Sequence, residues 1–294
     1  RWDEDLLSLF GIPAEMMPET ILPADGSFGS YRGIPITGVL GDSHAALYGQ
    51  GCHAAGMAKA TYGTGSSVMM NVGDAPVISR RGLSASVAFS AGGQTHYALE
   101  GNVTCSGDTL VWLCKTAGLF ESPDEIERLA GTVDGAQGVE MVPAFAGLGA
   151  PHFDSDARAL LCGMNRGTTK AHIAYAALAS IAQQDADILE IMQQESGYRP
   201  KWLFVDGGPT RNPLLMQMQA DYAGCVIRSA VASELSALGA AYIGGIQTGV
   251  YRDFESIPAR QAKGRTYEPT LTDAQRNELR QSWKSAVRRA LSGQ

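Results

Sequence analysis

Short apolar runs, each followed by glycine or by small polar residues, make up much of the first part of the chain. Residues 57–103 hold strand-like runs with glycine-bearing turns between them, which is typical of a β-meander. The expected strands are Met57–Thr61, Ser67–Asn71, Ser84–Phe89 and Thr95–Glu100. Before them the pattern predicts a helix at Asp5–Phe10, a strand at Ile34–Leu40 and a small-residue helix at Ser43–Gly51.

Helical and strand-like patterns alternate after residue 104. We expect helices over residues 104–118 and 123–131, and the longest helix at Lys170–Ser196, with Gly197 as its C-cap. The later elements predicted are strands at Val139–Pro143, Ala159–Met164, Trp202–Val205 and Val226–Arg228, and helices at Pro213–Gly224 and Glu234–Gly249. A strand meander followed by alternating helix and strand argues for α/β layering around a mixed sheet.

An amphipathic helix is expected at the end of the chain. Thr272 and Gln275 have the spacing of a capping box, which predicts that the helix begins there. The buried stripe predicted from the helical period consists of Leu279, Trp283, Val287 and Leu291.

Composition narrows the class of protein. With 45% hydrophobic and 18% charged residues among 294, the chain can form a substantial core. The net charge is -7 and the basic residues are scattered, so no nucleic-acid partner is expected. No apolar run is long enough to span a membrane. The five cysteines lack the spacing of a metal site, which predicts no metal ligands and is typical of buried thiols in a cytoplasmic protein.

Three motifs place glycine and small polar residues directly after an apolar run. They are Gly41–His44 (GDSH), Thr61–Ser66 (TYGTGS) and Val205–Asn212 (VDGGPTRN). Such turns let backbone N–H groups approach an anion or a ring closely. Three of them in this order indicate a nucleotide-binding lobe with a candidate catalytic carboxylate, and therefore phosphoryl transfer.

Asp42 is that candidate carboxylate. At the end of a predicted strand and just before a helix, it can accept a proton from a substrate hydroxyl, which is the role of a general base in phosphoryl transfer. Aspartate is also a favoured helix N-cap. The sequence leaves both interpretations open, and they do not exclude each other.

The turn Gly63-Thr64-Gly65 joins two predicted strands. Its backbone amides and the Thr64 hydroxyl are suited to bind the β- and γ-phosphate oxygens of a nucleotide. An ordinary glycine hairpin is the alternative, and the chain contains no GxxxxGK[ST] phosphate loop.

Gly207 and Gly208 follow a predicted buried strand and precede a helix. Two glycines there would let an adenine and its ribose approach the backbone, and Asn212 lies one helical turn further on to hydrogen-bond them. A tight strand-to-helix turn without a ligand is the alternative.

Taken together, these motifs resemble the FGGY family of carbohydrate kinases, whose fold is shared with actin, Hsp70 and hexokinase (the ribonuclease H-like fold). The glycerol-kinase branch is the most similar. The resemblant stretches are Pro35–Gly51, Gly56–Gly65, Tyr97–Gly107, Val142–Gly167, Val205–Asn212 and Leu238–Gly244, in the family's order. The resemblance implies a lobe with a mixed sheet flanked by helices.

The resemblance also implies roles for single residues. Asp42 matches the base that deprotonates the acceptor hydroxyl, and Thr64 matches a residue of the phosphate loop. Gly107, Gly208 and Asn212 match positions that line an ADP site. The family uses ATP with Mg²⁺ and closes two lobes around its ligands, which excludes water from the transfer.

Two departures from the family pattern affect the substrate. Ser43 stands where glycerol kinases usually carry Gln, and Ser66 and Ser67 replace a bulkier pair beside the glycerol pocket. These changes favour a longer polyol or a ketose, because buried hydroxyls need hydrogen-bond partners. We therefore expect Asp42, Ser43 and Ser67 to face a small sugar or polyol.

A third departure concerns the extent of the chain. The family carries a large N-terminal lobe before this region, and residues 1–36 resemble the end of that lobe, whereas residues 37–294 resemble the C-terminal, nucleotide-binding lobe. We therefore expect little or no kinase turnover from the isolated chain. Relatives form dimers or tetramers, so a homo-oligomer is compatible with the resemblance.

Three functional hypotheses remain open on these residues. The first is an ATP-dependent, glycerol-kinase-like enzyme, and the second is a pentulose or other ketose kinase of the same family. The third is a non-catalytic, actin-like module that binds nucleotide. Asp42 argues against the third, because nucleotide binding alone does not require a base at that position.

Overall fold

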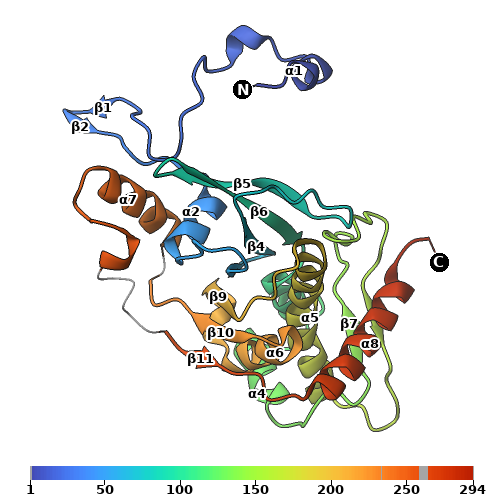
Figure 1. Ribbon diagram of the computed structural model, residues 1–294. Coiled ribbons are helices and arrows are strands. Elements are labelled where there is room, and N and C mark those ends of the chain that lie inside the picture. The colour runs from blue at the N-terminus through green and yellow to red at the C-terminus, as the bar shows by residue number, and fades with distance from the viewer. Residues whose placement is uncertain (1, 233, 258–263, 294) are drawn as a thin grey trace.

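The computed structural model describes residues 2–232, 234–257 and 264–293 (Figure 1). Within these residues the centre of the fold is a seven-stranded mixed sheet with the strand order β11-β10-β9-β3-β4-β6-β5. The strands are β3 (Ala58–Tyr62), β4 (Ser66–Gly73), β5 (Ser84–Ala91), β6 (Gln94–Val103), β9 (Trp202–Gly207), β10 (Val226–Ser229) and β11 (Thr266–Tyr267). Strands β10, β9 and β3 run parallel, and the other neighbours pair antiparallel. The predicted meander is therefore confirmed as β3 to β6.

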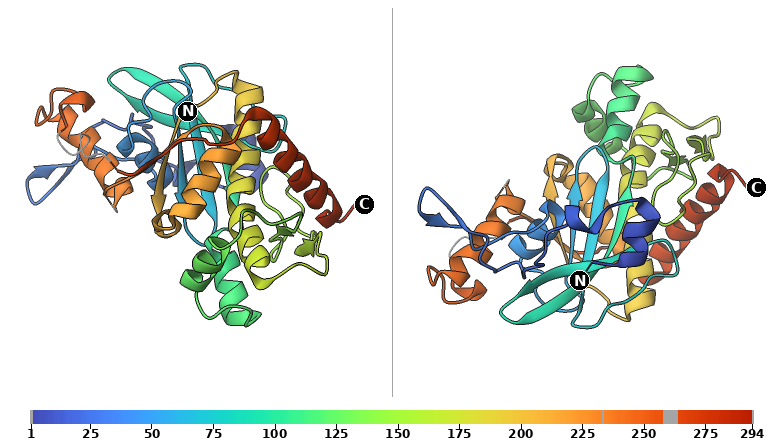
Figure 2. Two further views of the ribbon diagram at one scale, coloured as in Figure 1. Left: turned by 90° about the horizontal axis from the view of Figure 1, so that it is seen from below. Right: turned by 90° about the horizontal axis from the view of Figure 1, so that it is seen from above.

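Helices cover both faces of this sheet (Figure 2). One face packs against α5 (Lys170–Ser196) and α6 (Pro213–Ala223), and the other packs against α2 (Asp42–Gly49) and α7 (Leu235–Gln247). Side chains alternate between the faces along a strand, so Ala60 and Tyr62 join the core beneath α5, whereas Met69 joins the core beneath α2.

The remaining elements surround this three-layer centre. They are α1 (Glu4–Phe10), β1 (Ser30–Tyr31), β2 (Ile34–Pro35), α3 (Gly107–Val111), the π-helical turn η2 (Trp112–Thr116), α4 (Pro123–Ala130), β7 (Glu140–Val142), β8 (Leu160–Cys162) and α8 (Asp273–Ala290), with 3-10 turns η1 (Ala14–Met16), η3 (Gly208–Arg211) and η4 (Phe254–Ser256). The helix expected over residues 104–118 begins only at Gly107 and widens into η2. The long helix α5 has the predicted bounds, and Gly197 ends it in the left-handed conformation.

The strand predicted at Ile34–Leu40 is wrong beyond its first two residues. Ile34 and Pro35 form β2 in a small hairpin with β1, and the segment then continues without regular structure. Pro35 lacks an N–H to donate to a sheet. Gly38 lies so close to α7 that a Cβ there would be 2.6 Å from the Ala240 carbonyl oxygen. The segment therefore packs against a helix and not beside a strand.

The capping box that begins α8 is confirmed, but its buried stripe differs from the prediction. Trp283 and Val287 are buried as expected and Leu291 is half-buried, whereas Leu279 is 39% exposed and Arg280 is only 6% exposed. The reason is a polar contact with α5. The Arg280 guanidinium donates to the backbone and side-chain oxygens of Gln183, at 2.9 and 2.6 Å, and pairs with Asp187.

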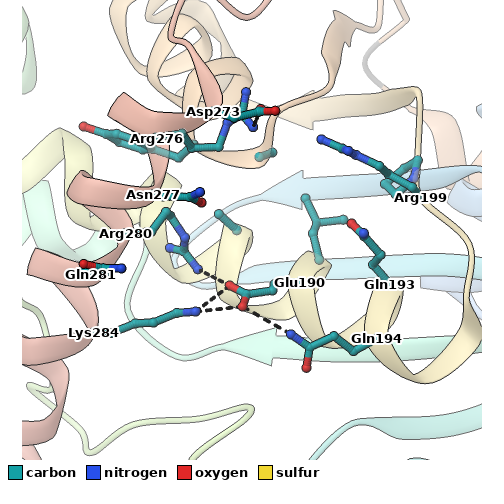
Figure 3. Close-up of a pocket in the computed structure, with 15 residues that line it drawn as sticks. Glu190, Gln193, Gln194, Arg199, Asp273, Arg276, Asn277, Arg280, Gln281 and Lys284 are labelled. Carbon is teal, nitrogen blue, oxygen red and sulfur yellow. Dashed lines mark hydrogen bonds and ion pairs between the residues drawn. The ribbon is translucent and has the colours of Figure 1, made fainter.

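Figure 3 shows the outer part of this contact, in a pocket of about 480 Å³ between α5 and α8. Glu190 on α5 lies between Arg280 and Lys284, and both of its oxygens are 2.7 Å from the Lys284 ammonium. The Trp283 indole donates to Asp187 at 2.7 Å. These charged side chains pair with one another, so the interactions in this pocket connect α5 to α8.

The cysteines and the apolar helices also bear on the expectations from composition. All five cysteines are free thiols, and Cys52, Cys105, Cys162 and Cys225 are buried. No helix in the described part of the chain is long and apolar enough to cross a membrane.

The Arg280 contact generates a stability prediction. Replacing Arg280 by Ala removes the cation that pairs with the largely buried Asp187 carboxylate and donates to Gln183, and we expect a loss of about 3 kcal/mol in the free energy of unfolding. The matched control is Arg288→Ala on the same helix, where the exposed side chain should matter by less than about 0.5 kcal/mol. Chemical unfolding followed by tryptophan fluorescence measures both, and equal losses would contradict the assignment.

Candidate functional site

Three turns leave the sheet at one edge. Tyr62 at the end of β3 pairs in parallel with Gly207 at the end of β9, so the chain emerges from both strands side by side. Val103 at the end of β6 pairs with Ser66 at the start of β4, which places the turn after β6 at the same edge. Ligand sites in α/β sheets form at the carboxyl ends of parallel strands, and this edge has that geometry.

Backbone hydrogen bonds tie the first two turns together. The Gly107 N–H donates to the Gly63 carbonyl at 3.0 Å, and the Ser106 and Asp108 N–H groups donate to the Thr64 carbonyl at 2.8 and 3.1 Å. Below them the Ser66 hydroxyl donates to the buried Ser106 hydroxyl at 2.7 Å. The Thr64 carbonyl is held inward, while Thr64 itself is exposed at the edge.

A pocket of about 490 Å³ opens between these turns and helices α3, α4 and α6. Five of the residues predicted to bind nucleotide line it: Gly63, Thr64, Gly107, Gly208 and Asn212. Leu110, Val111 and Leu215 add apolar surface, and Asp108, Asp124, Glu127 and Arg211 add charge. The pocket therefore combines exposed backbone at one side with an apolar wall at the other, as a nucleotide requires.

Gly65 and Gly207 do not line this pocket, and their surroundings show why glycine is needed. A Cβ on Gly65 would lie 2.2 Å from the Val103 carbonyl oxygen, and one on Gly207, where φ is +99°, would lie 1.9 Å from the Tyr62 carbonyl oxygen. Both glycines allow strands to approach each other. Gly208 differs, because its Cβ position has no atom within 4 Å and opens into the pocket.

Asn212 has a structural bond in addition to its place in the pocket. Its side-chain oxygen accepts the Leu215 N–H at 2.9 Å and caps the N-terminus of α6. The amide nitrogen donates no hydrogen bond within the described part of the chain.

Asp42 is the first residue of α2, and the cap position belongs to Gly41. Its carboxylate is exposed and accepts the Ser43 N–H at 2.6 Å, while its carbonyl accepts the Ser236 hydroxyl of α7 at 2.9 Å. A negative charge in the first turn suits the helix dipole. Asp42 and Ser43 do not line the nucleotide pocket; they lie on the other side of the sheet edge, with α2 and α7.

Ser67 lies on that same side, beside a buried lysine that the sequence analysis missed. Lys59 is 1% exposed, and its ammonium donates to the Thr61 and Ser67 hydroxyls at 3.1 and 3.2 Å. Ser67 in turn donates to Glu100 at 3.2 Å. A single lysine inside an otherwise small, apolar strand was the signal that could have identified this group.

The Lys59 ammonium lies near two carboxylates, those of Asp206 and Glu100. The Thr61 hydroxyl donates to Asp206 at 2.7 Å, and Gln50 donates to the same oxygen at 3.1 Å. Burial lowers the pKa of Lys59, and the carboxylates of Asp206 and Glu100 oppose that shift. Burial likewise raises the pKa of Asp206, opposed by its hydrogen bond from Thr61 and by Lys59. The polar group Lys59–Thr61–Ser67–Glu100–Asp206, called the Lys59 cluster below, thus adjoins the carboxyl ends of β3 and β9.

Residues 58–248 match the model of the C-terminal domain of the FGGY family of carbohydrate kinases. The chain belongs to the FGGY family. Glycerol kinases of Acinetobacter baylyi and Bdellovibrio bacteriovorus are 45% and 43% identical to this FGGY chain over 99% and 98% of its length. In both cases the match covers 60% of the relative, so the chain spans less than two thirds of the relatives it matches.

Solved structures agree with this assignment. The Plasmodium falciparum glycerol kinase with ADP has a TM-score of 0.93 and 31% identity, covering all of this FGGY chain and 60% of that protein. A xylulose kinase from Lactobacillus acidophilus has a TM-score of 0.87 at 20% identity, covering 100% of this chain and 61% of its own, and shows the fold alone. The α/β fold of the actin and hexokinase type, with a mixed sheet flanked by helices, is confirmed.

The two neighbouring glycines generate a paired prediction. Gly207→Ala forces a Cβ against the Tyr62 carbonyl at a positive φ, and we expect a loss of about 3 kcal/mol or more in the free energy of unfolding. Gly208→Ala meets open space and should change that free energy by less than about 1 kcal/mol. Thermal and chemical unfolding distinguish the two, and equal losses would show that the close strand approach is not required.

Proposed function

We propose that this chain is the nucleotide lobe of an ATP-dependent carbohydrate kinase that phosphorylates a hydroxyl of a small polyol or sugar. The observation that carries the proposal is the pocket that gathers Gly63, Thr64, Gly107, Gly208 and Asn212 from three separate turns. Its relatives named glycerol kinase support the polyol as acceptor. The Plasmodium falciparum glycerol kinase, whose crystal structure is a complex with ADP, supports an adenine nucleotide.

The proposed chemistry assigns one role to each side of the sheet edge. The Thr64 hydroxyl, exposed at the turn, binds phosphate oxygens, while Asn212 orients the nucleoside. The Gly63 N–H donates to the Gly65 carbonyl at 2.7 Å, and Gly65 lies outside the pocket, so we assign no phosphate contact to these two amides. Asp42 accepts the proton of the acceptor hydroxyl, whose oxygen bonds to the γ-phosphorus. The bond from that phosphorus to the bridging oxygen breaks, and ADP leaves.

The acceptor would lie beside Asp42, Ser43 and Ser67. Ser67 is half-buried and already bonded to Lys59 and Glu100, so it presents a polar, small-walled surface. Such a surface suits an acceptor with several hydroxyls, and a ketose is the alternative to glycerol on these grounds.

Magnesium accompanies ATP in this proposal. Among the described residues no group of three His, Cys, Asp or Glu side chains could hold a metal ion, and we assign no step to the ion. We further propose a cytoplasmic protein, and leave open a dimer or tetramer.

The domain division is also a proposal. Helix α1 buries none of its residues, and Figure 1 shows it set apart from the sheet. Leu9, Phe10 and Met16 are more than 70% exposed. Exposed apolar side chains in such density suit a protein contact. We propose that residues 1–36 pack against a sugar-binding lobe and that residues 37–294 form the nucleotide lobe, so that the isolated chain has little turnover.

Calorimetric titration of Mg-ADP into the 294-residue chain tests the pocket. We expect binding in the wild type and a loss of roughly tenfold in affinity for Asn212→Ser, which keeps an N-cap oxygen for α6 but lacks the amide donor. Asn212→Ala should lose the same affinity and, in addition, about 1 kcal/mol of stability. Absence of binding by the folded chain would contradict a complete nucleotide pocket here.

Asp42→Asn tests the base, in a protein that carries both lobes of the family fold. We expect kcat to fall by about 10²–10⁴-fold while ADP affinity barely changes, because the amide cannot accept the proton and Asp42 lies outside the nucleotide pocket. Steady-state kinetics with coupled ADP detection measure the first quantity, and calorimetry measures the second. Unchanged turnover would reduce Asp42 to a residue that stabilises the start of α2.

A further inference from the structure

A buried polar layer lies between the nucleotide turns and helix α5. Its central residue is Asp185 of α5, which is completely buried, and neither of its carboxyl oxygens accepts a hydrogen bond within the described residues. A buried carboxylate without a donor is strongly disfavoured, so this carboxyl requires an explanation.

Two polar side chains face Asp185 from the neighbouring elements. Tyr62 of β3 places its hydroxyl beside the carboxyl, and Gln219 of α6 lies beyond it. The Tyr62 hydroxyl donates its single hydrogen to the Gln219 side-chain oxygen at 2.7 Å, which leaves none for Asp185. The amide nitrogen of Gln219 is also buried without a partner among the described residues.

These three side chains can be connected in two directions. With Asp185 protonated, its O–H can donate to the Tyr62 oxygen while Tyr62 donates to the Gln219 oxygen; the second of these bonds is present in the structure. With Asp185 ionised, Tyr62 must donate to Asp185, and a half-turn of the Gln219 amide lets its nitrogen donate to the Tyr62 oxygen. One proton on Asp185 therefore selects the direction of the chain.

The electrostatic surroundings place this proton near neutral pH. Burial raises the pKa of Asp185 from 3.8 to about 7, and the neighbouring Tyr62 hydroxyl and the charge of Lys59 on the opposite face of β3 oppose the shift. Tyr62 from β3 is the polar group beside the carboxyl, and Gln219 from α6 is the partner of Tyr62. Neither is charged at neutral pH, since an amide does not ionise and burial raises the pKa of Tyr62.

The layer contacts the walls of the nucleotide pocket. Tyr62 directly precedes Gly63, and its carbonyl is the atom against which Gly207 packs. Gln219 belongs to α6, which Asn212 caps. Gln184, the neighbour of Asp185, donates to the Cys105 carbonyl at 3.1 Å, just before the turn that contains Gly107. The layer and its immediate chain neighbour thus adjoin all three turns.

We propose that Asp185 is a positioning residue for the nucleotide turns, and that its carboxyl proton sets the direction of the Asp185–Tyr62–Gln219 hydrogen-bond chain and thereby tunes nucleotide affinity. The tuning of affinity rests on the proposed function, whereas the state of the carboxyl does not. Neutral Asp185 keeps the layer dry and the turns in place. An ionised carboxyl favours hydration and loosening of the layer, so nucleotide should bind the neutral form more tightly.

The test is the affinity for Mg-ADP between pH 6 and 8 in the wild type and in Asp185→Asn, which keeps the shape but cannot ionise. Dividing one dissociation constant by the other removes the titration of the nucleotide's own phosphates. We expect the wild-type constant to rise relative to that of Asp185→Asn by roughly threefold or more over this range. A ratio that does not change with pH would overturn the tuning of affinity.

Two further variants separate positioning from general packing. Tyr62→Phe removes the Tyr62 bond from both forms, and the bond to the ionised carboxylate is the stronger because it is charge-assisted, so the transition should move to higher pH. An unmoved transition would overturn the hydrogen-bond chain. Asp74→Asn removes an exposed carboxylate elsewhere and should follow the wild type at every pH.

Unfolding distinguishes a failure of this inference from a failure of the proposed function. The folded pKa of Asp185 exceeds the unfolded one, so its stabilising effect is complete below about pH 4 and is lost as pH rises to about 7. The melting temperature of the wild type should therefore fall relative to that of Asp185→Asn across this window. If the melting temperatures of the two proteins changed in parallel with pH, the assignment of a protonated Asp185 carboxyl would be overturned. If neither protein bound ADP but the melting curves diverged, the proposed function and the tuning of affinity would fail, and the protonated carboxyl would stand.

Discussion

The parallel pairing of β3 with β9 is the constraint on which the rest of the site depends. At its end, Tyr62 and Gly207 approach so closely that no side chain fits on Gly207. This approach makes two turns leave the sheet side by side, and the antiparallel pairing of β4 with β6 adds the third. The proposed nucleotide pocket is therefore a consequence of sheet register, which brings together turns that lie far apart in the sequence.

Helix α5 packs against the sheet behind this edge and is itself tied to α8. Several polar residues of α5 have partners on other elements: Gln184 supports the turn after β6, and Gln183 and Asp187 anchor the buried Arg280. A helix of 27 residues that buries polar side chains gains specificity of position from them, because each needs its partner in one place. Asp185 has no hydrogen-bond partner among the described residues, and protonation of its carboxyl is the way in which its burial is tolerated.

Local signals predicted the elements and the glycine turns wherever they agreed with the tertiary environment. Gly197 ended α5 as expected, because a cap acts within one turn of chain. The strand at Ile34–Leu40 failed because the backbone at Gly38 approaches α7 and not another strand, while Ile34, Ile36 and Val39 are exposed; local periodicity does not reveal this. In the site, the resemblance to FGGY kinases gave Asp42 a role that stands as a proposal. Lys59 and Asp185 were missed, since their importance arises from burial and from neighbours that lie far away in the chain, Asp206 for Lys59 and Tyr62 for Asp185.

The alternation of side chains along β3 explains how one strand can serve both sides of the reaction proposed here. Tyr62 points toward α5 and joins the uncharged layer that supports the nucleotide turns, whereas Lys59 and Thr61 point toward α2 and join the charged Lys59 cluster near Asp42. A slip of one residue in the β3–β9 register would exchange these faces and bury the ammonium beneath α5. The close contact at Gly207 opposes such a slip. The contact at Gly207 thus helps to keep the Lys59 cluster and the uncharged layer around Tyr62 on opposite faces of β3.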